Sequence, residues 1–157
     1  MIKRPNGYWA DLSNQRAFLE ELALTLGFHD KEEKGKEWYE KWYAVSAEEV
    51  VRHGGQGLLS DYYGRSMYNL LRAVFPEHEW LPWRFPVLPK LIWKEETVVE
   101  KAVRFVENEL HLRGGNDWKR VRTSELEDLH VFRLFEANGG VSAVIRRYYP
   151  DVQWEQK

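Results

Sequence analysis

LLRAVFPEHEW at residues 70–80 and VIRRYYPDVQW at residues 144–154 align without gaps. Both stretches begin with two aliphatic residues, and Phe75 matches Tyr149. They share an arginine, a proline and a tryptophan at the same places, which are Arg72 with Arg146, Pro76 with Pro150, and Trp80 with Trp154. Internal similarity of this kind indicates that one supersecondary unit is used more than once. We therefore expect two related units, each ending in Pro-x-x-x-Trp.

Both halves of the chain carry short helical patterns that end at glycine or proline. In the first half, we predict helix starts at Ser13, Ser46 and Ser66 and helix ends at Gly27, Gly54–Gly55, Gly64 and Pro76. In the second half, the capping pairs that start helices are Thr97 with Glu100 and Ser124 with Glu127, and Ser142 starts the last helix. The predicted helix ends are near Leu112, before Gly114–Gly115, and at Asn138–Gly140. These patterns predict an all-α fold of two divergent, helix-turn-helix-like repeats with almost no sheet.

The register of the second unit has two alternatives. Aligning Pro-x-x-x-Trp pairs Gly140 with Ser66, whereas aligning the double glycines pairs Gly139 with Gly54. The second unit is thus either a divergent copy or a copy that lost a helix. Residues 80–93, WLPWRFPVLPKLIW, contain three prolines and predict an extended connection instead of a helix. The predicted organisation is a first repeat over residues 1–80, a proline- and tryptophan-rich strap over 81–94, and a second repeat over 95–157.

The composition is that of a globular protein with many aromatic residues. The 157 residues are 43% hydrophobic and 15% aromatic, enough for one domain or two small units. The absence of cysteine excludes disulfides, thiolate nucleophiles and zinc ribbons. No stretch approaches the roughly 20 apolar residues of a membrane span, and the start MIKRPNGYW lacks the apolar core of a secretory signal. For a chain that begins at its native Met, these features predict an intracellular protein with no membrane partner.

Candidate catalytic and metal-binding patterns are weak. His78 lies between two glutamates, but adjacent side chains diverge, so we interpret it as a turn residue. His53 precedes a double glycine and suits a helix C-terminus. His29 stands in an acidic loop with Asp30, Glu32 and Glu33, which we interpret as solvated instead of metal-binding. The GGQG at residues 54–57 lacks the Lys-Ser/Thr and the preceding strand of a phosphate loop. We predict no enzymatic activity, no metal and no cofactor.

The charge balance restricts a nucleic-acid interface to a local patch. The chain has 23 basic and 25 acidic residues, whereas nucleic-acid binders are more often basic. Ser66–Phe75 is the candidate recognition helix of a helix-turn-helix, and Arg113 belongs to a cluster between two later helices. We predict binding of nucleic acid, DNA foremost, by salt-sensitive phosphate contacts from Arg65, Arg72, Lys119, Arg120, Arg122, Arg146 and Arg147.

A protein partner is the alternative. Small helical units rich in tryptophan, tyrosine and arginine offer the residue types that dominate binding hot spots. A nearly neutral chain also suits a protein-interaction module or a subunit of a larger assembly better than it suits a DNA-binding protein. The sequence leaves the choice between DNA and RNA, the sequence specificity and the oligomeric state open.

The first unit resembles a family of repeats. It contains W-x-D-x-x-NQR starting at Trp9, then GGQGLLSDYYGRS at 54–66 and VFPEHEWLPWRF at 74–85. Over about residues 8–93 this is similar to repeats of uncharacterised, often multi-repeat proteins of fungi, oomycetes and algae. The second half lacks the NQR, the GLL and the PEH-W-PW ending. In that family such units can sit beside nuclease-like or zinc-ribbon segments, so the resemblance implies a link to nucleic acid and supplies no catalytic residues.

Overall fold

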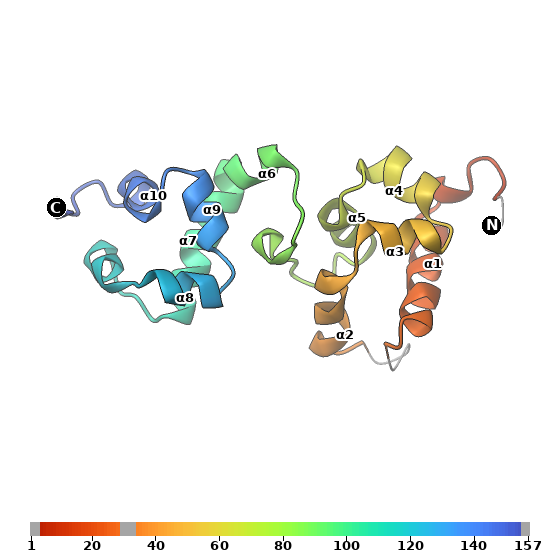
Figure 1. Ribbon diagram of the computed structural model, residues 1–157, viewed down its shortest axis with the longest axis horizontal. Coiled ribbons are helices and arrows are strands. Elements are labelled where there is room, and N and C mark those ends of the chain that lie inside the picture. Colours follow the sequence, from red (N-terminus) through yellow and green to blue (C-terminus); the bar gives the residue numbers. More distant parts are fainter. Residues whose placement is uncertain (1–3, 29–33, 155–157) are drawn as a thin grey trace. The chain divides into compact units, whose positions relative to one another are not determined.

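The structure, a computed structural model, describes residues 4–28 and 34–154. Within those ranges the chain forms helices, turns and loops and contains no strand, so the predicted all-α class is confirmed (Figure 1). The chain divides into two compact units. The first comprises Met1–Leu81 and Phe85–Val87, and the second comprises Pro82–Arg84 and Leu88–Lys157. The segment predicted as a strap is therefore shared between the units.

The first unit contains seven short elements within its described residues, several with the predicted caps. They are η1 (Tyr8–Ala10), α1 (Leu12–Thr25), α2 (Lys36–Glu40), η2 (Lys41–Ala44), α3 (Ala47–Arg52), α4 (Gln56–Tyr63) and α5 (Met67–Val74). The hydroxyls of Ser46 and Ser66 accept backbone hydrogen bonds at the starts of α3 and α5, as predicted. The predicted cap of α1 is wrong by two residues. Asp11 is the N-cap there, because its carboxylate accepts from the Ser13 N–H at 2.9 Å.

Aromatic side chains form the core of the first unit around α5. Five of the eight residues of α5 are buried. Trp42, Phe75 and Phe85 are almost fully buried, and the ring centroids of Trp38 and Phe75 lie 5.2 Å apart in an edge-to-face arrangement. The indole N–H of Trp80 donates to the Phe75 carbonyl at 2.9 Å, so the turn after α5 is fixed to the core.

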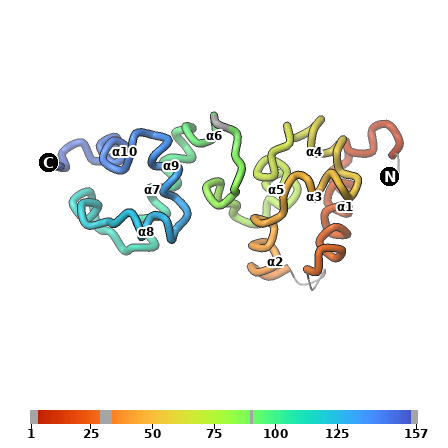
Figure 2. Tube along the Cα trace, viewed as in Figure 1, coloured from red at the N-terminus to blue at the C-terminus, as the bar shows by residue number. Residues whose placement is uncertain are grey.

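The second unit also has seven elements within its described residues, and Figure 2 follows the chain through them. They are η3 (Pro82–Arg84), α6 (Lys90–Lys94), α7 (Glu96–Glu109), η4 (Gly115–Arg120), α8 (Thr123–Asp128), α9 (Phe132–Ala137) and α10 (Val141–Tyr148). The prediction that residues 80–93 contain no helix is wrong. Pro82 opens η3 and Pro89 is the N-cap of α6. Proline is compatible with these positions because the first residues of a helix need no N–H donor.

Three predicted helix starts in the second unit are misplaced by one or two residues. Glu95 precedes α7, so Thr97 lies inside that helix. Arg122 is the N-cap residue of α8 in place of Ser124, and Glu125 accepts from the Arg122 N–H at 2.9 Å. Gly140 precedes α10, which starts one residue before Ser142.

The end of α7 also differs from the prediction. The helix ends at Glu109, before the expected break at Gly114–Gly115, because His111 turns into the left-handed region with φ 56°. The Leu112 N–H then donates to the Glu107 carbonyl at 2.8 Å. In the first unit Gly27, with φ 91°, ends α1 in the same way, as predicted.

Helices of equal length recur in the same order in the two units. The longest helices, α1 and α7, have 14 residues each, and α3 and α8, which come later, have six residues each. The last helices, α5 and α10, have eight residues each. The residues that follow them, Phe75 and Tyr149, have similar backbone angles, with φ/ψ of −119°/65° and −135°/71°. Each donates its N–H at 2.8 Å to the carbonyl four residues earlier.

Candidate functional site

The predicted arginines of the first unit are exposed but partnered. Arg65 lies in the turn before α5, with its guanidinium 3.8 Å from Glu48. Arg72 lies over the ring of Tyr68 at 4.6 Å and donates to its hydroxyl at 3.2 Å. Because most of α5 is buried, this helix has few exposed side chains with which a recognition helix would contact bases.

The two predicted arginines of α10 differ from each other. Arg147 lies 3.6 Å from the Glu96 carboxylate and donates to the Asn138 carbonyl at 3.4 Å. Arg146 is exposed and forms no ion pair with the residues that the structure describes. Only one of the two charges is therefore without an acidic partner.

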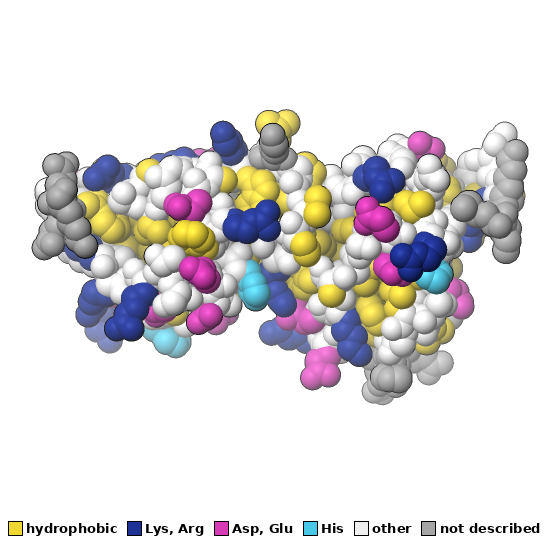
Figure 3. Space-filling view, viewed as in Figure 1, with side chains coloured by type: hydrophobic (Ala, Val, Ile, Leu, Met, Phe, Trp, Pro, Cys, Tyr) yellow, Lys and Arg dark blue, Asp and Glu magenta, His cyan; other side chains and the backbone are white. Residues whose placement is uncertain are grey.

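Residues 113–122, here named the basic segment, bring four exposed cations together: Arg113, Lys119, Arg120 and Arg122. Its single acidic residue is Asp117, which pairs with Arg120 at 2.5 Å and accepts from the Arg113 N–H at 2.8 Å. The Arg113 hydrogen bond and the Arg120 contact lower the pKa of Asp117. Within the described ranges, the other three cations form no ion pair. Figure 3 shows dark blue side chains gathered at the end of the second unit where η4 and α8 lie.

Packing fixes the basic segment to the core of the second unit. Trp118, at the centre of η4, is 1% exposed and its indole N–H donates to Glu107 at 3.1 Å. Its ring lies 5.8 Å from that of Phe135 on α9. Gly115 packs so closely against Tyr149 that an added Cβ would lie 2.7 Å from the Tyr149 Cβ. Lys119 and Arg120 therefore lie on a short helix that is packed against α7, α9 and α10, and Arg113 and Arg122 flank that helix.

The carboxylate of Glu107 is the polar centre of this packing. It accepts hydrogen bonds from the hydroxyl of Tyr149 at 2.6 Å, from Trp118 and from Arg104 at 2.9 Å. Burial alone would raise the pKa of Glu107, but these three hydrogen bonds outweigh burial and lower it. Glu107 thus stays charged and neutralises Arg104, which leaves the exposed cations of η4 out of the network.

A pocket of about 290 Å³ lies beside the basic segment. Here named the α7–α8 pocket, it is lined by Leu110, His111, Leu112, Asp117, Arg120, Val121 and Glu125. Its walls thus come from the turn after α7, from η4 and from the start of α8. Sequence reasoning missed this pocket, because its residues come from three elements and no motif connects them.

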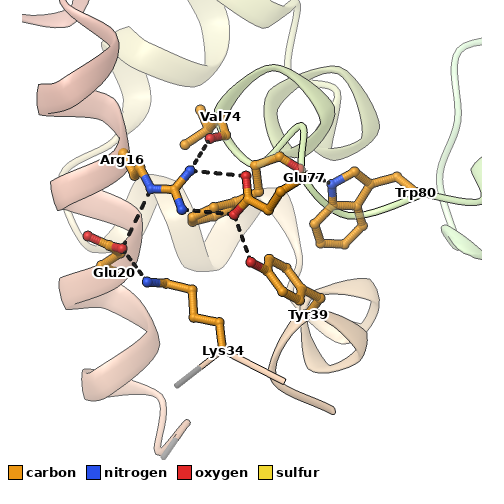
Figure 4. A network of polar contacts seen from close by, with 8 residues as sticks. Arg16, Glu20, Lys34, Tyr39, Val74, Glu77 and Trp80 are labelled. Carbon is orange, nitrogen blue, oxygen red and sulfur yellow. Dashed lines mark hydrogen bonds and ion pairs between the residues drawn. The ribbon is translucent and has the colours of Figure 1, made fainter. Parts of the chain in front are cut away.

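The first unit has a polar network of its own, drawn in Figure 4. Arg16 on α1 donates two hydrogen bonds to Glu77, at 2.8 and 3.2 Å, and one to the Val74 carbonyl at 3.0 Å. The Tyr39 hydroxyl donates to Glu77 at 2.7 Å. Burial would raise the pKa of Glu77, but the hydrogen bonds from Arg16 and Tyr39 lower it to about 2. Burial and the bond to Glu77 raise the pKa of Tyr39 to about 12.

The histidines singled out in the sequence have packing roles where the structure describes them. His78 is half-buried and stacks on Tyr39 with ring centroids 4.7 Å apart. His53 is the C-cap residue of α3, with its ring nitrogen 3.7 Å from Glu49. His29 and its acidic neighbours lie outside the described residues. Among residues 4–28 and 34–154, no group of His, Asp and Glu side chains has the arrangement of a metal site.

Comparison with protein-family models, curated proteins and solved structures found no match to this chain. The resemblance to the fungal, oomycete and algal repeats therefore stays a prediction. No helix within the described residues has both the length and the apolar character needed to cross a membrane.

Proposed function

We propose that this protein binds nucleic acid non-enzymatically through the basic segment of its second unit. The observation that supports this proposal is that Arg113, Lys119 and Arg122, on an anchored 3₁₀ helix and its flanks, are exposed and form no ion pair with the described residues. A cation that is already held in an ion pair contributes less binding free energy when it contacts a phosphate, because the existing pair must be broken first. We therefore assign the interface to residues 113–122 and not to the predicted recognition helix Ser66–Phe75.

The proposed contacts are to phosphates and not to base edges in a groove. Phosphate contacts release condensed counterions, so the binding they produce weakens steeply as salt rises. A net charge of −2 for the whole chain makes avid, indiscriminate binding unfavourable, and the local excess of charge must supply the attraction. We therefore expect moderate affinity at low salt and little binding at high salt. Arg146 on α10 forms no ion pair within residues 4–28 and 34–154, so we extend the same proposal to that residue.

We also propose that the two units are divergent copies in the register set by Pro-x-x-x-Trp. In that register α5 corresponds to α10, α4 to α9, and Ser66 to Gly140. The matching order of elements and the similar turns at Phe75 and Tyr149 support this register. In this register the cations of the basic segment have no counterpart in the first copy, since they align with Tyr39, Val45, Ser46 and Glu48.

The test is a fluorescence-anisotropy titration of labelled single-stranded DNA, duplex DNA and RNA. Substituting Arg113, Lys119 and Arg122 together by Gln should weaken binding at low salt by roughly tenfold or more, because three phosphate contacts are lost. The melting temperature should change little, since these side chains form no ion pair with described residues. The matched control substitutes Arg52, Arg65 and Arg72 by Gln, which removes the same charge from the first unit.

The control protein should bind like the wild type. If binding weakened equally in the two variants, net charge and not the basic segment would determine the affinity. That result would overturn the site assignment. No binding of the wild-type protein to any of the three polymers at low salt would overturn the function itself.

A protein-interaction module is the second candidate, and one observation favours it. Leu91 on α6 is 81% exposed, so its aliphatic side chain is open to contact by a partner. A photo-crosslinking residue placed at position 91 should then capture one defined protein partner in the expressing cell, whereas the same residue at the exposed Glu109 should not. Equal capture at both positions would contradict this candidate.

A further inference from the structure

The α7–α8 pocket combines apolar walls with a polar edge. Leu110, Leu112 and Val121 contribute aliphatic surface, and His111 adds a planar ring. The polar groups are the guanidinium of Arg120, which donates hydrogen bonds, and the carboxylates of Asp117 and Glu125, which accept them. A ligand that fits has flat apolar faces and an edge carrying both donors and acceptors.

Hydrogen bonds join the polar edge of the pocket to the basic segment. Asp117 accepts from the Arg113 N–H at 2.8 Å and pairs with Arg120 at 2.5 Å. Glu125 accepts from the Arg122 N–H at 2.9 Å. The pocket and the exposed cations are therefore parts of one surface.

We propose that this pocket takes one unpaired nucleobase of a single strand whose phosphates lie along the basic segment. The inference rests on the function proposed above and specifies its substrate class. A nucleobase has the required flat faces and polar edge, and the backbone phosphates of the strand would meet Arg113, Lys119 and Arg122. The bases of an intact duplex are stacked and paired, so entry would require unpairing first. A volume of about 290 Å³ suits a single small ring system, because pockets for drug-sized ligands start near 300 Å³.

His111 places a planar ring in the lining of the pocket. This residue has φ 56°, a conformation that glycine adopts without strain and that Gly27 occupies at the end of α1. Here the chain places an imidazole at the position, and that imidazole lines the pocket. Histidine is one of the side chains on which unstacked bases stack in single-strand recognition.

The experiment compares three labelled probes bound by the full chain at the same low salt concentration. They are a single strand of about twelve nucleotides, a strand of equal length made of abasic residues, and a duplex of the same sequence. The base-bearing strand should bind at least about fivefold more tightly than the abasic strand and the duplex, because stacking of one base supplies that difference.

The decisive variant is His111→Gly, because it removes the ring and relieves the backbone. Binding of the base-bearing strand should fall by about fivefold, and binding of the abasic strand should stay the same. The melting temperature should not fall, which excludes unfolding as the cause. His130→Gly is the matched control, since His130 has φ 65° at the end of α8 and does not line the pocket. A second variant, Val121→Phe, should fill the pocket and weaken the same strand.

The outcomes distinguish a failure of the nucleobase pocket from a failure of the proposed function. Equal, salt-sensitive binding of all three probes would overturn the nucleobase pocket and leave the phosphate-binding function standing. Wild-type affinity in both His111→Gly and Val121→Phe would also overturn the pocket. No binding of any probe would overturn the pocket and the function together.

Discussion

At the residue scale, Glu77 joins three elements of the first unit. Its carboxylate holds Arg16 of α1 and Tyr39 of α2 next to the turn that follows α5. The guanidinium of Arg16 also lies 4.8 Å above the ring of Phe75. These contacts fix the position of α1 against the end of α5, so Glu77 has a structural role.

We expect Glu77→Gln to lower the free energy of unfolding by about 1 kcal/mol near pH 7, because an amide cannot pair with Arg16. The effect is modest because the Glu77 side chain is 38% exposed, and water screens the ion pair. The folded pKa near 2 lies below the ordinary 4.5. The carboxylate therefore contributes its full stabilisation above about pH 4.5 and loses it as the pH falls toward 2.

Urea denaturation of both proteins at about pH 7, 5 and 3 checks this expectation. The free energies of unfolding of wild type and Glu77→Gln should differ by the same amount at pH 7 and pH 5. This difference should be smaller at pH 3. Glu79→Gln, a change at an exposed neighbouring acid, should produce no comparable difference. A difference that is constant from pH 7 to pH 3 would show that the carboxylate is not held at a lowered pKa.

At the scale of single elements, local signals in the sequence placed some helix boundaries and missed others. The starts of α3 and α5 were predictable because Ser46 and Ser66 are the nearest good caps before an apolar run. Thr97 and Ser124 are equally good caps by residue type, but both lie one residue inside the first turn. Tertiary burial of the helix face decides between neighbouring starts, and one sequence does not contain that information.

The end of α7 was unpredictable for a different reason. Histidine carries no strong signal for a left-handed backbone, whereas Gly114–Gly115 is a conspicuous break that begins five residues after the helix ends at Glu109. Gly115 proves to have a packing role, because it brings η4 close to Tyr149 and Val152. The basic segment was therefore visible in the sequence, and the pocket beside it, which depends on His111, was not.

We expect Gly115→Ala to lower the free energy of unfolding by about 1–3 kcal/mol. The added methyl group would lie 2.7 Å from the Tyr149 Cβ, which is closer than carbon atoms pack, so η4 must shift from α10. Gly114→Ala is the matched control, since its added Cβ meets no atom within 4 Å and its backbone is extended. Thermal unfolding of both variants measures the effect, and equal melting temperatures would contradict the packing role of Gly115.

At the scale of the whole molecule, the sequence predicted the fold class and the presence of two helical parts more completely than it predicted the site. Glycine, proline and aromatic positions are local signals that determine short helices. How available a cation is for contact with a phosphate depends on its ion-pair partners, and those partners come from elements distant in the sequence. Arg147 pairs with Glu96 of α7, while three cations of the basic segment pair with no described residue. Arginines and lysines that are equivalent candidates in the sequence therefore differ in the structure in whether they form an ion pair.

The salt dependence of binding to a single strand tests the central claim most directly. The logarithm of the association constant, plotted against the logarithm of the salt concentration, should have a clearly negative slope for the wild-type protein. Replacing Arg113, Lys119 and Arg122 by Gln should make that slope shallower by about 2, because each phosphate contact on a single strand contributes about 0.7. An unchanged slope in this variant, or a wild-type slope near zero, would contradict nucleic-acid binding through the basic segment.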